Sequence, residues 1–122
     1  MLQHTHEDLN QVVALEDYNL YDSDAVLRDA VERHGAVWHA AALSQYGAQL
    51  GSASVMQLGE LANRHLPQLR SHDRFGNRID RVEFHPAWSS LMGMLYAQGV
   101  HCLPWEMQRP GAHVARAAGF FL

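Results

Sequence analysis

The sequence predicts a mainly α-helical fold of about five helices, interrupted by one small β-hairpin. Apolar residues recur at helical spacing along most of the chain. Three of the five segments that carry this spacing begin at Ser, Asp or Pro residues, and most of the five are followed by Gly or Pro. Residues 72–88 differ, because they read as a tight turn, a short β-prone run and the start of another helix.

The composition is that of a single folded domain. A chain of 122 residues with 48% hydrophobic residues is apolar enough for one core, and a formal net charge of −4 favours no particular class of partner. The sequence contains no apolar run long enough to span a bilayer and no basic-then-apolar leader. Cys102 is its one cysteine, so no disulfide framework is expected. These features favour a reducing, cytoplasmic location without membrane contact.

Residues 1–22 are predicted to form an extended N-terminal arm, because they show no helical period and end in a turn-like segment. Such an arm is either loose or docked onto a partner surface. Docking is favoured by its apolar residues, which are Val12, Val13, Leu15, Tyr18, Leu20 and Tyr21. Residues 23–122 are predicted to form part of one helical domain.

The first helix is predicted to run from a cap at Ser23 or Asp24 to about His34. Gly35 ends it, since glycine readily adopts the left-handed conformation that follows many helices. Its apolar stripe consists of Val26, Leu27, Ala30 and Val31.

Two more helices are predicted before the hairpin. One covers roughly residues 36–50, with Trp38 as its large anchor. The other begins at the capping residue Ser52, reaches about His65 and is stopped by Pro67.

The hairpin is predicted to lead directly into a fourth helix. Residues 75–77, Phe-Gly-Asn, tolerate the positive φ that a tight turn requires. Pro86 suits the first turn of a helix that runs to about Gln98, because its missing N–H has no helical partner to lose there. The β-prone run between turn and helix carries Ile79, Val82 and Phe84.

Residues 99–111 are predicted to be a loop, and a fifth helix is predicted to begin near Ala112. No stop signal follows its three final apolar residues, so we expect the sequence to be cut within this helix. The alternative is a complete domain in which Phe120 and Phe121 dock back onto the core.

Nine histidines raise the question of a metal site: His4, His6, His34, His39, His65, His72, His85, His101 and His113. Metal ligands must converge on one point, usually at helical spacing or beside Cys and carboxylate companions. Only His4 and His6 stand close together, and both lie in the predicted arm. We therefore expect solvated or hydrogen-bonded histidines and no metal ligands.

No catalytic or cofactor-binding residue is predicted. Cys102 follows His101, but neighbours in a chain point in different directions, so Cys102 is expected to be a packing residue. The sequence contains no Gly-x-Ser-x-Gly elbow and no glycine-rich phosphate cradle. The residues alone therefore indicate a helical domain without a visible active site.

Arginines crowd the predicted hairpin, at Arg70, Arg74, Arg78 and Arg81. Arginine side chains on a hairpin can contact phosphate groups. The interleaved acids nearly cancel this local charge; they are Asp73, Asp80 and Glu83. We therefore expect a solvated or subunit-contacting hairpin. We expect each tryptophan to be an anchor in the core or in an interface; they are Trp38, Trp88 and Trp105.

The chain resembles the extreme N-terminal part of the AidB-type, adaptive-response branch of the acyl-CoA dehydrogenase flavoproteins. The matching pieces run in order along nearly the whole chain, and residues 72–88 are the most specific of them. They are Tyr18-Asn19-Leu20-Tyr21 with Ser23-Asp24, Gly35-Ala36 with Trp38, Leu50-Gly51-Ser52-Ala53, Leu58-Gly59 with Leu61-Ala62-Asn63, residues 72–80, Val82, residues 84–88, Leu103-Pro104-Trp105 and residues 109–118. One departure is a single Pro67 after Leu66, where the family is richer in proline.

The resemblance implies the N-terminal helical domain of an acyl-CoA dehydrogenase-like architecture, which the family completes with a middle β domain and a C-terminal helical domain. It also implies FAD in the parent protein, a homotetramer, and possible DNA contacts through the C-terminal region. The catalytic base and most of the flavin site lie outside this part of the family, so no cofactor is expected on this chain alone. The implied roles of the domain are part of the substrate-pocket wall and subunit contacts, through residues 1–22 and 70–85.

The resemblance favours a domain of an FAD-dependent, acyl-CoA dehydrogenase-like protein of the DNA-alkylation response. A standalone helical interaction module without catalytic activity is the alternative. A small nucleic-acid-binding protein is disfavoured by the interleaved acids and the net charge of −4.

Overall fold

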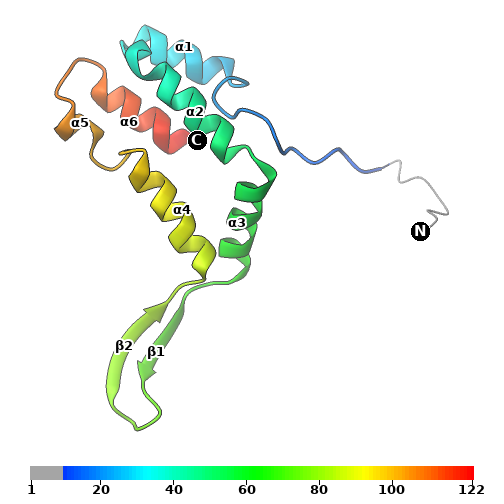
Figure 1. The fold of residues 1–122 in the computed structure, drawn as a ribbon, viewed down its shortest axis with the longest axis vertical. Coiled ribbons are helices and arrows are strands. Elements are labelled where there is room, and N and C mark those ends of the chain that lie inside the picture. The colour runs from blue at the N-terminus through cyan, green and yellow to red at the C-terminus, as the bar shows by residue number, and fades with distance from the viewer. Residues whose placement is uncertain (1–9) are drawn as a thin grey trace.

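The computed structural model describes residues 10–122 of the chain, drawn in Figure 1. Its elements are α1 (Ala25–Arg33), the 3₁₀ turn η1 (Val37–His39), α2 (Ala40–Leu50), α3 (Ala53–Arg64), β1 (Gln68–His72), β2 (Arg78–Glu83), α4 (Pro86–Ala97), α5 (Leu103–Glu106) and α6 (Ala112–Phe121). The two strands form one antiparallel sheet. The predicted fold class, mainly α-helical with a single hairpin, is confirmed.

The helix count differs from the prediction, and one predicted helix is divided into two elements. Among the described residues there are six α-helices rather than about five. The additional one, α5, lies inside the predicted loop 99–111, where Pro104 occupies the first turn of a single helical turn. The predicted helix 36–50 is divided, since η1 precedes α2.

The core lies between α1, α2, α5 and α6, which we call the helical body. Its buried cluster consists of Tyr21, Val31, Ala36, Leu43, Leu103, Ala115 and Ala118. Trp38 packs against this cluster and donates a hydrogen bond from Nε1 to the Pro110 carbonyl at 3.0 Å. Trp38 is therefore a core anchor, as predicted.

Two glycines lie close together where α1 ends and where α6 begins. Gly35 ends α1 with φ +76°, and Gly111 precedes α6 with φ +83°. Both values are in the left-handed region that favours glycine. A Cβ at Gly111 would overlap the Gly35 carbonyl oxygen, so this close approach requires glycine at position 111.

The segment before α1 lies against α2 of the same chain. The N–H of Leu20 donates to the Gly47 carbonyl at 3.2 Å, and the Asn19 amide donates to the Ser44 carbonyl at 2.9 Å. Tyr21 enters the core. Farther toward the N-terminus, Val12, Val13 and Leu15 are all exposed. Residues 1–9, with His4 and His6, lie outside the described residues.

The remaining elements form a second region, which we call the hairpin limb: α3, β1, β2 and α4. The two helices pack against each other, and the hairpin projects from their far end, away from the body (Figure 1). No residue of the limb belongs to the core cluster described above.

Candidate interaction surface on the hairpin limb

The hairpin turn is held by Asp73. Its carboxylate accepts hydrogen bonds from the N–H groups of Phe75 at 2.8 Å and Asn77 at 2.9 Å, and from the Asn77 amide at 3.0 Å. The bonds from Asn77, with those from the backbone, lower the pKa of the Asp73 carboxyl. Gly76 has φ +85°, which confirms the positive φ predicted at this turn.

A β-bulge sets which side chains share a face of the hairpin. Leu69 pairs with Val82 and His72 pairs with Arg78, so β2 contains one residue more than β1 between these pairs. Counting from the His72–Arg78 pair, Ile79 lies opposite Ser71 and hence on the face of Leu69 and Val82. Without the extra residue, Ile79 and Val82 would point to opposite faces, because they are three residues apart.

Asp80 supplies the conformation that the bulge needs. Its φ is +43°, one of only two positive φ values at non-glycine positions among residues 10–122. Aspartate tolerates the left-handed region better than most residues do. The Asp80 carboxylate also accepts a hydrogen bond from Arg78 Nε at 2.7 Å. The sequence pattern did not predict this bulge, because it shows Asp80 only as a charge among arginines.

The result is an apolar hairpin face, made of Leu69, Ile79, Val82 and Phe84. Their exposed fractions are 66%, 43%, 48% and 42%, so each of these side chains keeps a substantial part of its surface exposed. Phe84 stacks on Trp88 of α4 with ring centroids 4.2 Å apart, which extends the apolar surface onto the helix. A continuous, exposed apolar surface of this kind is typical of an interaction site.

The opposite face of the hairpin is charged, and several of its charges are paired. Arg70 bonds Glu83 at 3.0 Å across the strands, and Arg78 bonds Asp80 at 2.7 Å. Arg74 lies over the ring of Phe75 at 4.5 Å. These two ion pairs agree with the expected near-cancellation of charge on the hairpin.

Two stacked histidines mark the base of the hairpin, where the chain enters and leaves it. His65 follows α3 and His85 caps α4, and their ring centroids are 4.7 Å apart. Nδ1 of His85 accepts a hydrogen bond from the N–H of Ala87 at 3.1 Å. The stacked rings of His65 and His85 therefore join the two chain segments at the base of the hairpin.

The other residues considered for chemistry do not converge. Within residues 10–122, no three His, Cys, Asp or Glu side chains are arranged to hold a metal ion. His101 packs edge-on against Tyr96, and His113 against the exposed Trp105. Partial desolvation and the neighbouring Glu106 raise the pKa of the Cys102 thiol, which disfavours the nucleophilic thiolate.

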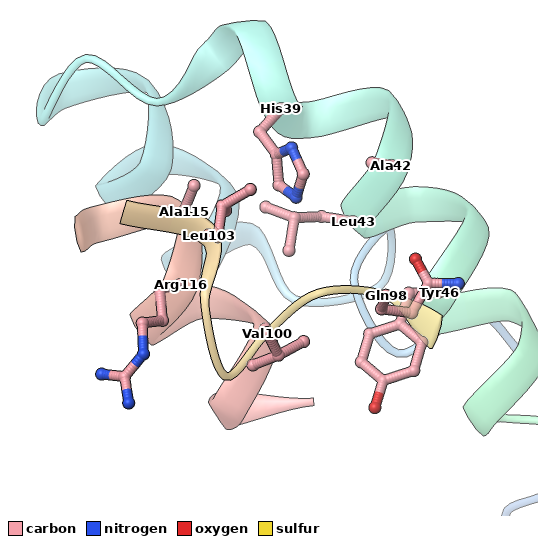
Figure 2. A pocket seen from close by; sticks show the side chains of 10 residues that line it. His39, Ala42, Leu43, Tyr46, Gln98, Val100, Leu103, Ala115 and Arg116 are labelled. Carbon is pink, nitrogen blue, oxygen red and sulfur yellow. The ribbon is translucent and has the colours of Figure 1, made fainter. Parts of the chain in front are cut away.

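The helical body contains a small internal cavity, of about 10 Å³, between α2, α6 and the segment that precedes α5 (Figure 2). His39 and Leu43 line it from the α2 side, and Arg116 lines it from α6. Burial lowers the pKa of the His39 imidazole. A cavity of this size holds at most one water molecule, whereas ligand pockets usually measure about 300–1,000 Å³.

The fold is that of a helical domain of the acyl-CoA dehydrogenase class. The crystal structure of Caenorhabditis elegans ACDH-11 in complex with C11-CoA superposes with a TM-score of 0.78 at 22% identity, covering 98% of this chain and 21% of that one. At this identity the likeness concerns the fold alone.

The sequence comparisons identify the family. The family model described as "Adaptive response protein AidB N-terminal domain" matches residues 10–122. The Escherichia coli (strain K12) protein named "Putative acyl-CoA dehydrogenase AidB" is 49% identical over 119 residues, which is 97% of this chain and 22% of that protein. The chain belongs to the AidB N-terminal domain family, as its sequence predicted, and spans about a fifth of the length of this relative.

Among the described residues, none of the helices has the length and apolar character needed to traverse a lipid bilayer.

Proposed function

We propose that the chain acts as the N-terminal helical domain of an FAD-dependent, acyl-CoA dehydrogenase-like protein of the DNA-alkylation response, working in the cytoplasm. The observation that carries this proposal is the 49% identity to the Escherichia coli protein over 97% of the chain. The family described for residues 10–122 is named for an adaptive response, which supports the same assignment.

In this role the domain forms part of the substrate-pocket wall and supplies subunit contacts. Acyl-CoA oxidation needs a site that excludes water, and a packed helical body is suited to close one side of it. The contacts are assigned to the segment before α1 and to the hairpin, because both carry exposed apolar side chains. Examples are Val12 at 92% exposure and Phe75 at 74%.

The flavin site is assigned to other parts of the full-length protein, in keeping with the resemblance. The internal cavity of the helical body, of about 10 Å³, is far smaller than a flavin ring. In this class of enzyme, bound FAD would accept the hydride from the substrate. We therefore assign no catalytic step to a residue of this chain, and we assign any DNA contact of the parent protein to regions outside it.

The test compares the 122-residue chain with the full-length protein that carries it, by gel filtration with light scattering and absorbance in the flavin band. We expect a yellow homotetramer for the full-length protein, bleached by an acyl-CoA under anaerobic conditions, and a colourless isolated chain. A colourless full-length protein would contradict the proposal. A colourless, monodisperse monomer of the isolated chain with a colourless full-length protein would favour a standalone interaction module.

The subunit contacts are tested by Phe75→Ser and Phe84→Ser in the full-length protein. Val26→Ser is the matched control, since Val26 is 78% exposed on α1, within the helical body. We expect the hairpin variants to shift the tetramer toward smaller species while Val26→Ser does not. An unchanged tetramer in both hairpin variants would remove the hairpin from the subunit interface.

A further inference from the structure

A positive charge lies between two exposed aromatic rings on the side of the helical body formed by α5 and α6. The guanidinium carbon of Arg116 is 5.4 Å from the ring centroid of Trp105 and 4.9 Å from that of Phe120. Trp105 is 63% exposed and Phe120 is 53% exposed. The ring of His113 meets Trp105 edge-on, with centroids 6.1 Å apart. We call these four residues the α5–α6 patch.

Helical spacing and the packing of α5 assemble the patch. His113, Arg116 and Phe120 are three and four residues apart, so they share one face of α6. The single turn α5 packs against α6, and Leu103 anchors it in the buried core cluster. Trp105, two residues further on, stays exposed beside the Arg116 side chain.

Arg116 has hydrogen-bonding capacity that the described residues leave unused. Its Nε atom is buried and has no hydrogen-bond partner. None of the ion pairs among residues 10–122 includes Arg116. Figure 2 shows its side chain leading away from His39 and Leu43, with the guanidinium group at the far end. Within the described part of the chain, this charge therefore meets two ring faces and no carboxylate at salt-bridge distance.

A partner that covers the two rings must also cover the charge between them. Burying the rings against apolar side chains is favourable, whereas burying a guanidinium group without a counter-charge is costly. A carboxylate removes that cost, because the planar fork of arginine donates two parallel hydrogen bonds to its two oxygens. The chemistry of the patch therefore defines the occupant as an apolar surface that carries an Asp or Glu side chain.

We propose that the α5–α6 patch docks an Asp or Glu side chain, set among apolar residues, from the part of the full-length protein outside residues 10–122. This inference rests on the proposed function, in which the chain is one domain of a larger protein. The chain spans 22% of the Escherichia coli relative, so most of such a protein is available to supply the acid. The contact is separate from the segment before α1 and from the hairpin.

The charge of the patch distinguishes this occupant from others. Nucleic acid and anionic lipid surfaces engage several cations at once, whereas Arg116 is the single arginine of the patch. The same patch of a second copy would bring a second arginine toward the first, so a symmetric pairing of two patches is disfavoured. One cation between two rings matches one carboxylate with apolar neighbours.

A lysine at position 116 tests the contact by direct coupling. The 122-residue sequence contains no lysine, so Arg116→Lys introduces its one lysine amine. In the full-length protein, a carbodiimide joins this amine without a spacer to a carboxylate that touches it, and mass spectrometry of the peptides identifies the acid. Arg109→Lys is the matched control, because Arg109 also lies over a tryptophan ring, that of Trp38, outside the patch.

We expect Arg116→Lys to link to an Asp or Glu outside residues 10–122 at least about tenfold more readily than Arg109→Lys does. No link from position 116, a link to an acid within residues 10–122 such as Glu106, or equal yields from positions 116 and 109 would overturn the proposal. Should Arg116→Lys fail to fold, His113→Lys on the same face of α6 provides the same test with the same outcomes.

Flavin absorbance of the same samples separates the two proposals. A flavin-loaded protein in which neither position 116 nor position 113 links to an outside acid overturns the docking contact and leaves the proposed function intact. A protein without flavin overturns the proposed function itself.

Discussion

The helical body and the hairpin limb use apolar residues in opposite ways. In the body, Val31 and Leu43 are each only 2% exposed within a shared cluster. In the limb, Leu69 is 66% exposed although it lies in a regular strand. The body is therefore stabilised by its own packing, whereas the hairpin is held by local hydrogen bonds, and we propose that a partner surface covers its apolar face. An isolated two-stranded hairpin is marginal in water, so this difference supports the proposal that the hairpin is an interaction surface.

The strongest test of this comparison is a pair of leucine truncations. Leu43→Ala should lower the free energy of unfolding of the isolated chain by about 2–5 kcal/mol, because it leaves a cavity in the core. Leu69→Ala should change it by less than about 0.5 kcal/mol, since its side chain is already in water. Urea unfolding followed by circular dichroism measures both. Similar losses in the two variants would contradict the division into body and limb.

A second test uses glycines. Gly51→Ala places a Cβ on the Tyr18 carbonyl oxygen, so it should cost about 1–3 kcal/mol by displacing the segment before α1. A Cβ added at Gly59, inside α3, would meet no other atom within 4 Å. Gly59→Ala should stabilise the chain by about 0.5–1 kcal/mol, because alanine favours a helix. Thermal unfolding compares the two, and a stabilising Gly51→Ala would contradict the tight packing there.

The base of the limb is tested through the cap of α4. His85→Ala removes the acceptor for the Ala87 N–H and the ring that stacks on His65. It should cost about 1 kcal/mol, a typical value for losing a capping residue. His85→Asn restores a capping acceptor without the ring, so it should recover about half or more of that loss. Equal losses in the two variants, measured by urea unfolding, would assign the whole effect to the histidine stack.

The smallest expected effect is the loss of stability of the helical body at acid pH through His39. Burial lowers the pKa of His39 below its ordinary 6.5, so the unfolded chain takes up this proton at a higher pH than the folded chain does. The stability associated with neutral His39 is present above pH 6.5 and is lost as the pH falls below it. His39→Gln should flatten this part of the stability-versus-pH curve, whereas the exposed-site control His113→Gln should not. Parallel curves for wild type and His39→Gln would contradict the assignment.

The sequence predicted those features that depend on local chemistry. Asp24 accepts a hydrogen bond from the Leu27 N–H at 2.9 Å, as expected of a helix cap, and Pro86 occupies the first turn of α4. Ser52 precedes α3 as predicted, but its hydroxyl donates to the Gln49 carbonyl at 2.8 Å instead of capping the helix.

Features that depend on pairing across the chain were not predictable in the same way. Ile79 and Val82 were predicted only as parts of a β-prone run, and only the register against β1 reveals the bulge that places them on one face. The short helix α5 was missed because Pro104 suggests a loop, although proline is compatible with a first helical turn. The candidate surface was indicated by residue type alone; its face and its paired charges required the structure.

Hydrogen exchange at the backbone amides of the hairpin tests the central claim most directly. It is measured by mass spectrometry on the isolated chain and on the full-length protein. We predict rapid exchange over residues 68–83 and strong protection over α2 and α6 in the isolated chain, with the hairpin becoming protected in the full-length assembly. A hairpin as protected as α2 in the isolated chain, or as unprotected in the assembly as in isolation, would contradict the claim that this surface is built to meet a partner.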